Sequence, residues 1–167
     1  SLLAPYHADI DFRYGSGAVY YHLYNTGRNG TDMNVNNVKT AEALIRRLTG
    51  RSSFSIQTLL IVTWDKGVHF GDADGWISNR TTSFQLVLVS DGVYTYAVYK
   101  YFPAKMRYNG TYDVFIGYMF QSKEYNQHPL SFTKNALRID QYVETKGIQG
   151  VLFYPLTHET LDTISGL

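Results

Sequence analysis

The chain has 167 residues, of which 44% are hydrophobic and 17% are charged, and its formal net charge is +1. This size and composition suit one folded domain with a sizeable core, and they argue against intrinsic disorder. The balanced charge provides no basic surface for nucleic acid or for an anionic membrane, and the absence of cysteine excludes disulfides, thiol catalysis and cysteine-held metals.

The first segment with a clear pattern covers residues 6–12, where apolar and polar side chains alternate as in a strand. A second, aromatic segment covers residues 18–24, and a short glycine-containing segment lies between the two. Glycine-rich turns of this kind connect neighbouring strands. We therefore predict a β-hairpin over residues 6–24, followed by a polar loop over residues 25–37.

The one convincing helix covers residues 38–49. Apolar side chains recur there at helical spacing and form one face, which comprises Val38, Ala41, Leu44, Ile45 and Leu48. Asn36 or Asn37 can cap the start of this helix, and Gly50 can end it in the left-handed conformation. Two arginines fall in the last turn, where the helix dipole favours cations, so their placement needs no binding site.

Strand patterns dominate the rest of the chain. Residues 56–64 carry apolar and β-branched side chains on both alternating faces, which predicts a central strand covered on both sides. Residues 66–80 are rich in Gly and Asp and predict a long loop. Three later segments, residues 111–120, 137–142 and 150–154, are predicted to be strands as well.

An Asp-Gly pair at residues 91–92 separates two further strand patterns. Asp-Gly between strands is a strong signal for a hairpin with a two-residue turn. Such a turn would place Val89 opposite Tyr94 and Val87 opposite Tyr96, so that apolar residues face each other across the strands.

Together these elements predict an α+β, mainly β fold. We expect an antiparallel, sandwich-like sheet core with one principal helix, residues 38–49, packed on it. Neither a repeat nor a break in composition divides the chain. We therefore predict a single domain over residues 1–156 and a C-terminal linker or tail over residues 157–167.

Several short motifs occur in the order in which one known family has them. They are Ala4-Pro5-Tyr6, Ala8-Asp9-Ile10-Asp11, Val19-Tyr20-Tyr21, Thr63-Trp64, Phe84-Gln85-Leu86-Val87-Leu88, Asp91-Gly92, Tyr96-Ala97-Val98-Tyr99, Gly117 and Gly150-Val151-Leu152-Phe153. Over residues 2–156 the chain thus resembles the NIDO domain, an extracellular module of nidogen, alpha-tectorin, mucin-four type and sushi-nidogen-EGF proteins. One departure is His7, where many members carry Trp.

This resemblance implies a secreted protein or the ectodomain of a cell-surface protein. It also implies a non-enzymatic role in cell–matrix adhesion or matrix assembly, through an extracellular protein partner or through self-association. The residues themselves provide no catalytic triad, nucleophile elbow or phosphate-binding loop, so we expect no enzyme activity. We also expect no contact with nucleic acid and no membrane insertion of this domain, since the longest apolar run covers only residues 59–62.

The alternative function class is a glycan-binding, lectin-like module that depends on Ca²⁺ in one version. Asp9 and Asp11 fall on one face of the first predicted strand, and two carboxylates at this spacing can share an oxygen-ligated cation. The competing interpretation is an ordinary solvated strand face. Ca²⁺ is the one cofactor that the sequence suggests. A second candidate segment, Asp72-Ala73-Asp74-Gly75, lacks the later acidic ligands of a Ca²⁺ loop, so we expect it to be a turn.

Three N-glycosylation sequons lie in predicted loops or turns. They begin at Asn29, Asn79 and Asn109. We expect N-linked glycans at one or more of them, although Asn-Gly, present at two of the three, is also ordinary turn chemistry.

The aromatic content of 16% includes 15 tyrosines, which favours a β-rich fold with Tyr on half-exposed strand faces or, alternatively, a Tyr-rich contact surface. The longest predicted loops cover residues 25–37, 66–80 and 121–135. Recognition on β frameworks lies mostly on loops, and Trp and Tyr are enriched where binding energy concentrates. Trp76, Tyr24 and Tyr125 are therefore the candidate binding residues, with the alternative that Trp76 folds back onto the core.

Overall fold

The computed structural model describes residues 1–26, 32, 35–108, 110, 112–120 and 125–157. In chain order its elements are β1 (Leu2–His7), β2 (Ile10–Asp11), β3 (Ala18–Asn25), α1 (Asn36–Thr49), β4 (Thr58–His69), β5 (Thr82–Ser90), β6 (Thr95–Met106), β7 (Phe115–Met119), β8 (Tyr125–Gln127), the 3-10 helices η2 (Lys134–Gln141) and η3 (Thr145–Gly147), and β9 (Val151–Pro155). The predicted fold class, mainly β with antiparallel sheets and one principal helix, is confirmed.

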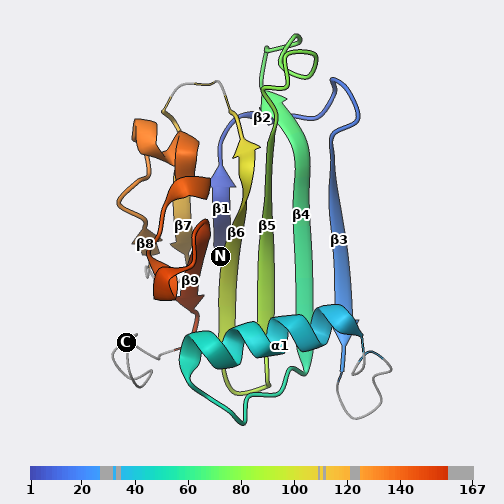
Figure 1. Ribbon diagram of the computed structural model, residues 1–167, viewed down its shortest axis with the longest axis vertical. Coiled ribbons are helices and arrows are strands. Elements are labelled where there is room, and N and C mark those ends of the chain that lie inside the picture. Colours follow the sequence, from blue (N-terminus) through green and yellow to red (C-terminus); the bar gives the residue numbers. More distant parts are fainter. Residues whose placement is uncertain (27–31, 33–34, 109, 111, 121–124, 158–167) are drawn as a thin grey trace.

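The strands form two antiparallel sheets. The larger sheet runs β3–β4–β5–β6–β9, and the short β2 pairs with the far end of β4, beyond β3. The smaller sheet has the order β1–β7–β8. α1 lies across the strands of the larger sheet near one end (Figure 1).

Two hydrophobic clusters lie on opposite faces of the larger sheet because side chains alternate along β6. On one face, Tyr96 and Val98 pack with the apolar stripe of α1, including Ile45. On the other face, Tyr99 and Tyr101 belong to the cluster that also contains side chains of the smaller sheet. The molecule is therefore a three-layer arrangement of helix, large sheet and small sheet.

The ends of α1 were predicted with mixed success. Gly50 follows the helix with φ 74°, and its N–H donates to Arg46 O, as predicted. The predicted asparagine cap is wrong, because Val35 occupies the N-cap position and no side chain caps the helix there. Asn37 instead lies within the first turn, where its amide donates to the Tyr24 hydroxyl at 2.6 Å.

The predicted hairpin over residues 6–24 is wrong. β1 crosses to the smaller sheet, where Leu2 pairs with Met119, whereas β2 and β3 both pair with β4. The strand pattern breaks at Ala8, whose carbonyl accepts from the N–H of Ile10 in a tight turn. One alternating segment of sequence therefore supplies strands to two different sheets.

The Asp-Gly hairpin forms, but its register differs by two residues from the prediction. Val89 pairs with Tyr96, and Ser90 pairs with Thr95. The reason is the Asp91 side chain, whose Oδ1 accepts from the N–H groups of Val93 and Tyr94 and holds them in a four-residue loop. A shift by two residues keeps every side chain on its expected face.

The closing part of the chain holds one further correction. The strand predicted over residues 137–142 is instead the end of η2, whose start is capped by Thr133. The strand predicted over residues 150–154 forms as β9 beside β6. The predicted tail lies almost wholly outside the described residues.

Buried tyrosines join the two sheets. Tyr99 donates its hydroxyl to the carbonyl oxygen of Gly117 in β7 at 2.7 Å, and Tyr101 donates to the carbonyl oxygen of Pro5 in β1 at 2.5 Å. Both side chains are almost fully buried. Burial raises the pKa of both hydroxyls, so they remain neutral donors across the physiological pH range.

We expect Tyr101→Phe to lower the free energy of unfolding by about 1–3 kcal/mol, since it leaves the buried Pro5 carbonyl without its donor. Urea denaturation monitored by circular dichroism measures this loss. Tyr112→Phe, at an exposed position, is the matched control and should leave the stability unchanged. Equal stability of both variants would contradict a structural role for the Tyr101 hydroxyl.

Candidate functional site

The three predicted binding aromatics have different environments. The side chains of Trp76 and Tyr125 are exposed by 42% and 66%, so both are available to a partner. Tyr24 lies in β3 rather than in a loop and is only 8% exposed, within the cluster beneath α1. Its role in the structure is to pack and to accept a hydrogen bond, so it is poorly suited to the exposed contact that we expected.

Trp76 occupies the loop between β4 and β5 and folds partly back onto the turn before β3. A Cβ added at Gly15 would lie 2.4 Å from Trp76 Cδ2, so only glycine allows the indole to pack there. The same loop is closed by Arg80, whose guanidinium donates to both carboxylate oxygens of Asp72 at 2.6 and 3.0 Å. Packing and an ion pair thus hold the loop and leave one side of the indole exposed.

Asp9 and Asp11 have different partners in the structure. The Asp11 carboxylate is engaged by Arg13, with an Arg13 NH2 to Oδ2 distance of 2.6 Å, and this hydrogen bonding lowers the pKa of Asp11. Asp9 is exposed, and its backbone carbonyl accepts from the hydroxyl of Tyr108. Burial, helped by the Asp9 carboxylate, raises the pKa of Tyr108 to about 12.

Nothing else in the described residues completes a cation site around this pair. No group of three His, Cys, Asp or Glu side chains with suitable geometry occurs in the part of the chain that the structure covers. Within that same part, no helix has the length and apolar character needed to cross a membrane.

One of the three sequons can be located. Asn79 is exposed at the end of the Trp76 loop, with a positive φ of 53°. The asparagines at positions 29 and 109 lie outside the described residues. The exposed position of Asn79 leaves room for a glycan.

An apolar surface on β3 was not predicted. Val19, Tyr21 and Leu23 are exposed by 46%, 78% and 59%. Through the strand register they adjoin half-buried apolar side chains of β4 and β5, namely Leu60, Val62 and Leu88. We call these six residues the β3 outer face.

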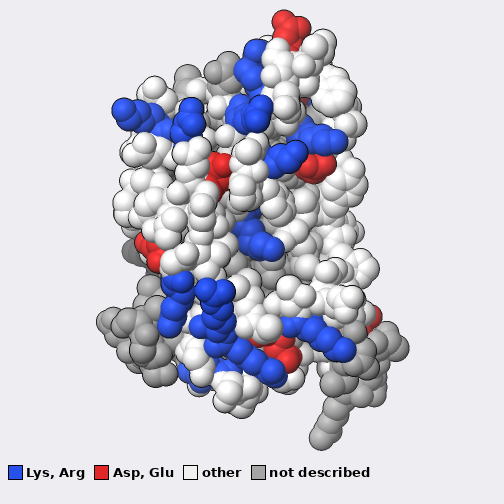
Figure 2. Space-filling model, in the orientation of Figure 1, with Lys and Arg blue, Asp and Glu red and all other residues white. Residues whose placement is uncertain are grey.

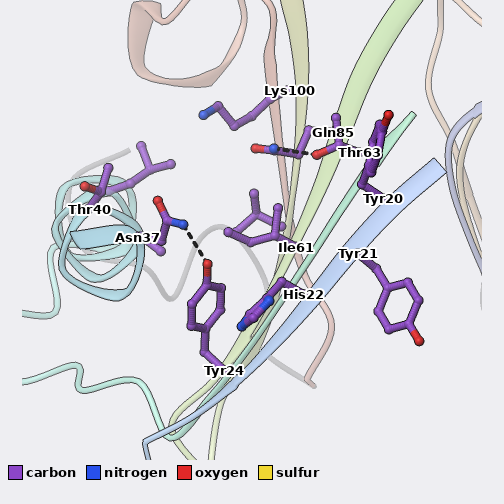
Figure 3. Close-up of a pocket in the computed structure, with 13 residues that line it drawn as sticks. Tyr20, Tyr21, His22, Tyr24, Asn37, Thr40, Ile61, Thr63, Gln85 and Lys100 are labelled. Atoms are coloured by element: carbon purple, nitrogen blue, oxygen red, sulfur yellow. Dashed lines mark hydrogen bonds between the residues drawn. The ribbon is translucent and has the colours of Figure 1, made fainter. Parts of the chain in front are cut away.

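The other side of β3 borders a hollow that was also missed. It has a volume of about 350 Å³ and lies between α1 and the open part of the larger sheet (Figure 3). We call it the helix–sheet hollow; the polar residues on its walls are Tyr20, His22, Asn37, Thr40, Thr63, Gln85 and Lys100. Tyr21 is drawn beside it but its ring points away, toward the β3 outer face.

One strand row forms the polar floor of the hollow. Tyr20 pairs with Thr63, Thr63 with Gln85, and Gln85 with Lys100 across four neighbouring strands. The Gln85 amide donates to Thr63 Oγ1 at 2.9 Å. The sequence signal for this row was the single lysine in an otherwise uncharged strand pattern at residues 95–101.

The layered core and these surfaces define the chain as a β-rich α+β module of sandwich type. It belongs to the NIDO family, because the nidogen-like domain model matches residues 1–158. The resemblance noted in the sequence is therefore confirmed.

Relatives among characterised proteins agree with this assignment. Mucin-4 from Mus musculus is 29% identical over 95% of this chain, mucin-4 from Homo sapiens is 27% identical over 95%, and nidogen-1 from Rattus norvegicus is 26% identical over 76%. The chain spans only 5% and 3% of the two mucins and 35% of nidogen-1. No solved structure gave a significant match.

The Asp72–Arg80 pair predicts a pH dependence. The hydrogen bond from Arg80 lowers the pKa of Asp72 below its usual 3.8. The ion pair therefore stabilises the folded loop fully above pH 3.8, and this stabilisation is lost as the pH falls through the lower pKa of the folded state. Asp72→Asn should lower the melting temperature at pH 7, and the gap to the native chain should narrow toward pH 3.

Thermal unfolding from pH 7 to pH 3 measures this gap. Asp74→Asn is the matched control, because Asp74 lies in the same loop and is exposed. A gap that stays constant over the whole range, or one that Asp74→Asn reproduces, would contradict the role of the ion pair.

Proposed function

We propose that the chain is a non-enzymatic extracellular module of a larger adhesive or matrix protein, which mediates protein–protein contacts in cell–matrix adhesion or matrix assembly. Membership of the NIDO family supports this proposal, as do the relatives, a mucin and a nidogen, which are extracellular or cell-surface proteins. The partner is an extracellular protein.

The observation that carries the proposal is the β3 outer face. Large apolar side chains exposed side by side are unusual on a monomer surface and mark places where proteins bind. Tyr21, the most exposed of them, can bury a large ring and still direct its hydroxyl to water or to a partner.

The backbone of β3 indicates what kind of partner fits. The N–H of Thr26 donates to Gln57 O, on the β4 side, while the N–H of Asn25 donates to Asp32 Oδ2. Because backbone groups alternate sides along a strand, those of Val19, Tyr21 and Leu23 point away from β4. β3 pairs with no other strand in the described part of the chain, and Figure 1 shows it at the edge of the larger sheet.

β3 also carries no Lys, Arg, Asp or Glu and no proline, the usual devices that keep an edge strand from pairing. We therefore propose that an extended segment of a partner protein adds to this edge and buries apolar side chains against the β3 outer face. Trp76 and Tyr125 remain candidate secondary contacts.

The test is binding of the glycosylated chain, secreted from eukaryotic cells, to purified collagens, laminins and fibronectin on a biosensor, and to itself. We expect saturable binding to a matrix protein that Tyr21→Lys weakens by about tenfold, the effect of losing about 1.4 kcal/mol of contact energy. Val93→Lys, at an exposed apolar position of the β5–β6 hairpin, is the control and should bind normally. Absence of binding to all of them, or equal binding of both variants, would overturn the assignment.

We further expect Asn79 to carry an N-linked glycan, since its side chain is exposed. Asn79→Gln should increase the electrophoretic mobility of the secreted chain by one glycan step. Peptide-N-glycosidase treatment should abolish the difference, and Asn126→Gln, outside any sequon, should migrate like the native chain. Identical migration of Asn79→Gln before deglycosylation would show that the site is not used.

A further inference from the structure

The helix–sheet hollow contains a lysine that has no counter-charge among the described residues. Lys100 is half-buried, and its ammonium makes no hydrogen bond or ion pair with any described residue. None of the 13 residues that line the hollow is acidic. An ammonium that lines a hollow without an acidic neighbour can pair with the anionic group of a ligand.

The surroundings reinforce the positive potential. Figure 2 shows more Lys and Arg than Asp and Glu on the face that carries α1. Lys39 and Arg47 are exposed on α1, and its Glu42 is already neutralised by Arg46 at 2.6 Å. An anionic ligand would therefore be attracted to the mouth of the hollow before it reaches Lys100.

Neutral polar groups around Lys100 indicate more than a bare anion. The Gln85 amide lies between Lys100 and Thr63, and Asn37 and Thr40 face the same space from the helix (Figure 3). Gln85 uses one amide N–H for Thr63 and retains its carbonyl oxygen and a second N–H for a ligand. Such a set of donors and acceptors suits a ligand with several hydroxyl groups.

The wall at β3 is aromatic. The exposed ring of Tyr20 and the imidazole of His22 line the same side, and His22 packs at a tilt against Tyr24 with ring centroids 4.3 Å apart. Aromatic faces of this kind pack against the C–H face of a sugar ring, while Tyr hydroxyls bond its hydroxyl groups. The volume of about 350 Å³ is in the range of sites for small ligands.

We propose that the helix–sheet hollow binds an acidic saccharide, a hexuronic or sialic acid residue, whose carboxylate pairs with Lys100. The sugar hydroxyls bond Gln85 and Thr63, and the ring packs on Tyr20. This site needs no metal ion, and it lies on the face of β3 opposite to the protein-binding face proposed above.

The experiment titrates the ¹⁵N-labelled chain with glucuronic acid, N-acetylneuraminic acid, neutral galactose and acetate, and follows amide shifts by NMR. We expect both acidic sugars to perturb residues around the hollow, with galactose and acetate each binding about tenfold or more weakly. Lys100→Gln, which removes the charge and leaves a slightly shorter polar side chain, should weaken the binding of the acidic sugars by about tenfold. Lys105→Gln, exposed on the same strand and outside the hollow, is the matched control.

Several outcomes overturn the proposal. Equal binding of galactose and glucuronic acid would remove the role of the carboxylate, and equal binding of acetate would reduce the site to an anion site that an acidic side chain of a partner could fill. If Lys100→Gln keeps the native melting temperature and binds the acidic sugars as tightly as the native chain, Lys100 has no role in binding. Leu23→Lys, on the β3 outer face and outside the lining of the hollow, should weaken matrix-protein binding and leave sugar binding intact. Lys100→Gln should leave matrix-protein binding intact, so the two proposals fail independently.

Discussion

The structure depends on how the tyrosines of β6 satisfy their hydroxyl groups inside the core. A buried tyrosine contributes a large apolar surface, but its hydroxyl costs free energy unless it finds an acceptor. Tyr99 and Tyr101 find theirs in the backbone of β7 and of β1, which belong to the other sheet. The two bonds therefore fix where the small sheet lies and leave β3 and part of β4 uncovered.

This placement generates both surfaces of functional interest. The small sheet covers β5 and β6 on one face, so the apolar side chains of β3 on that face remain exposed. On the opposite face, α1 covers only one end of the strands, and the remaining polar row with Lys100 forms the hollow. Each surface results from incomplete coverage of a sheet that is wider than the layers packed on it.

Sequence patterns predicted what is decided locally. The period of α1, its glycine terminator, the central strand and the existence of the Asp-Gly hairpin all depend on neighbouring residues, and all appear in the structure. The hairpin register was missed because one carboxylate, Asp91, captured two backbone N–H groups that the turn rule left free. The pairing of β1 was missed because its partner lies far along the chain, where no local pattern can indicate it.

The same distinction applies to the candidate site. The exposure of Trp76 followed from its polar loop, whereas Tyr24 belongs to a strand with aromatic side chains on both faces. Alternation alone could not tell which face of β3 is covered. One face meets α1, which packs over Tyr24, and the other face is exposed because the distant small sheet does not extend over β3. The spacing of Asp9 and Asp11 suggested a cation, but it could not reveal that Arg13 already neutralises Asp11.

The pairing of β1 with β7 also constrains how the chain folds during synthesis. β1 leaves the ribosome before its partners, because its ladder with β7 and its tyrosine donor in β6 both come from the second half of the chain. Contacts between such distant segments slow folding and keep apolar strands exposed meanwhile. The α1, β4 and β5 layer can form first, so β1 joins a core that is already partly built.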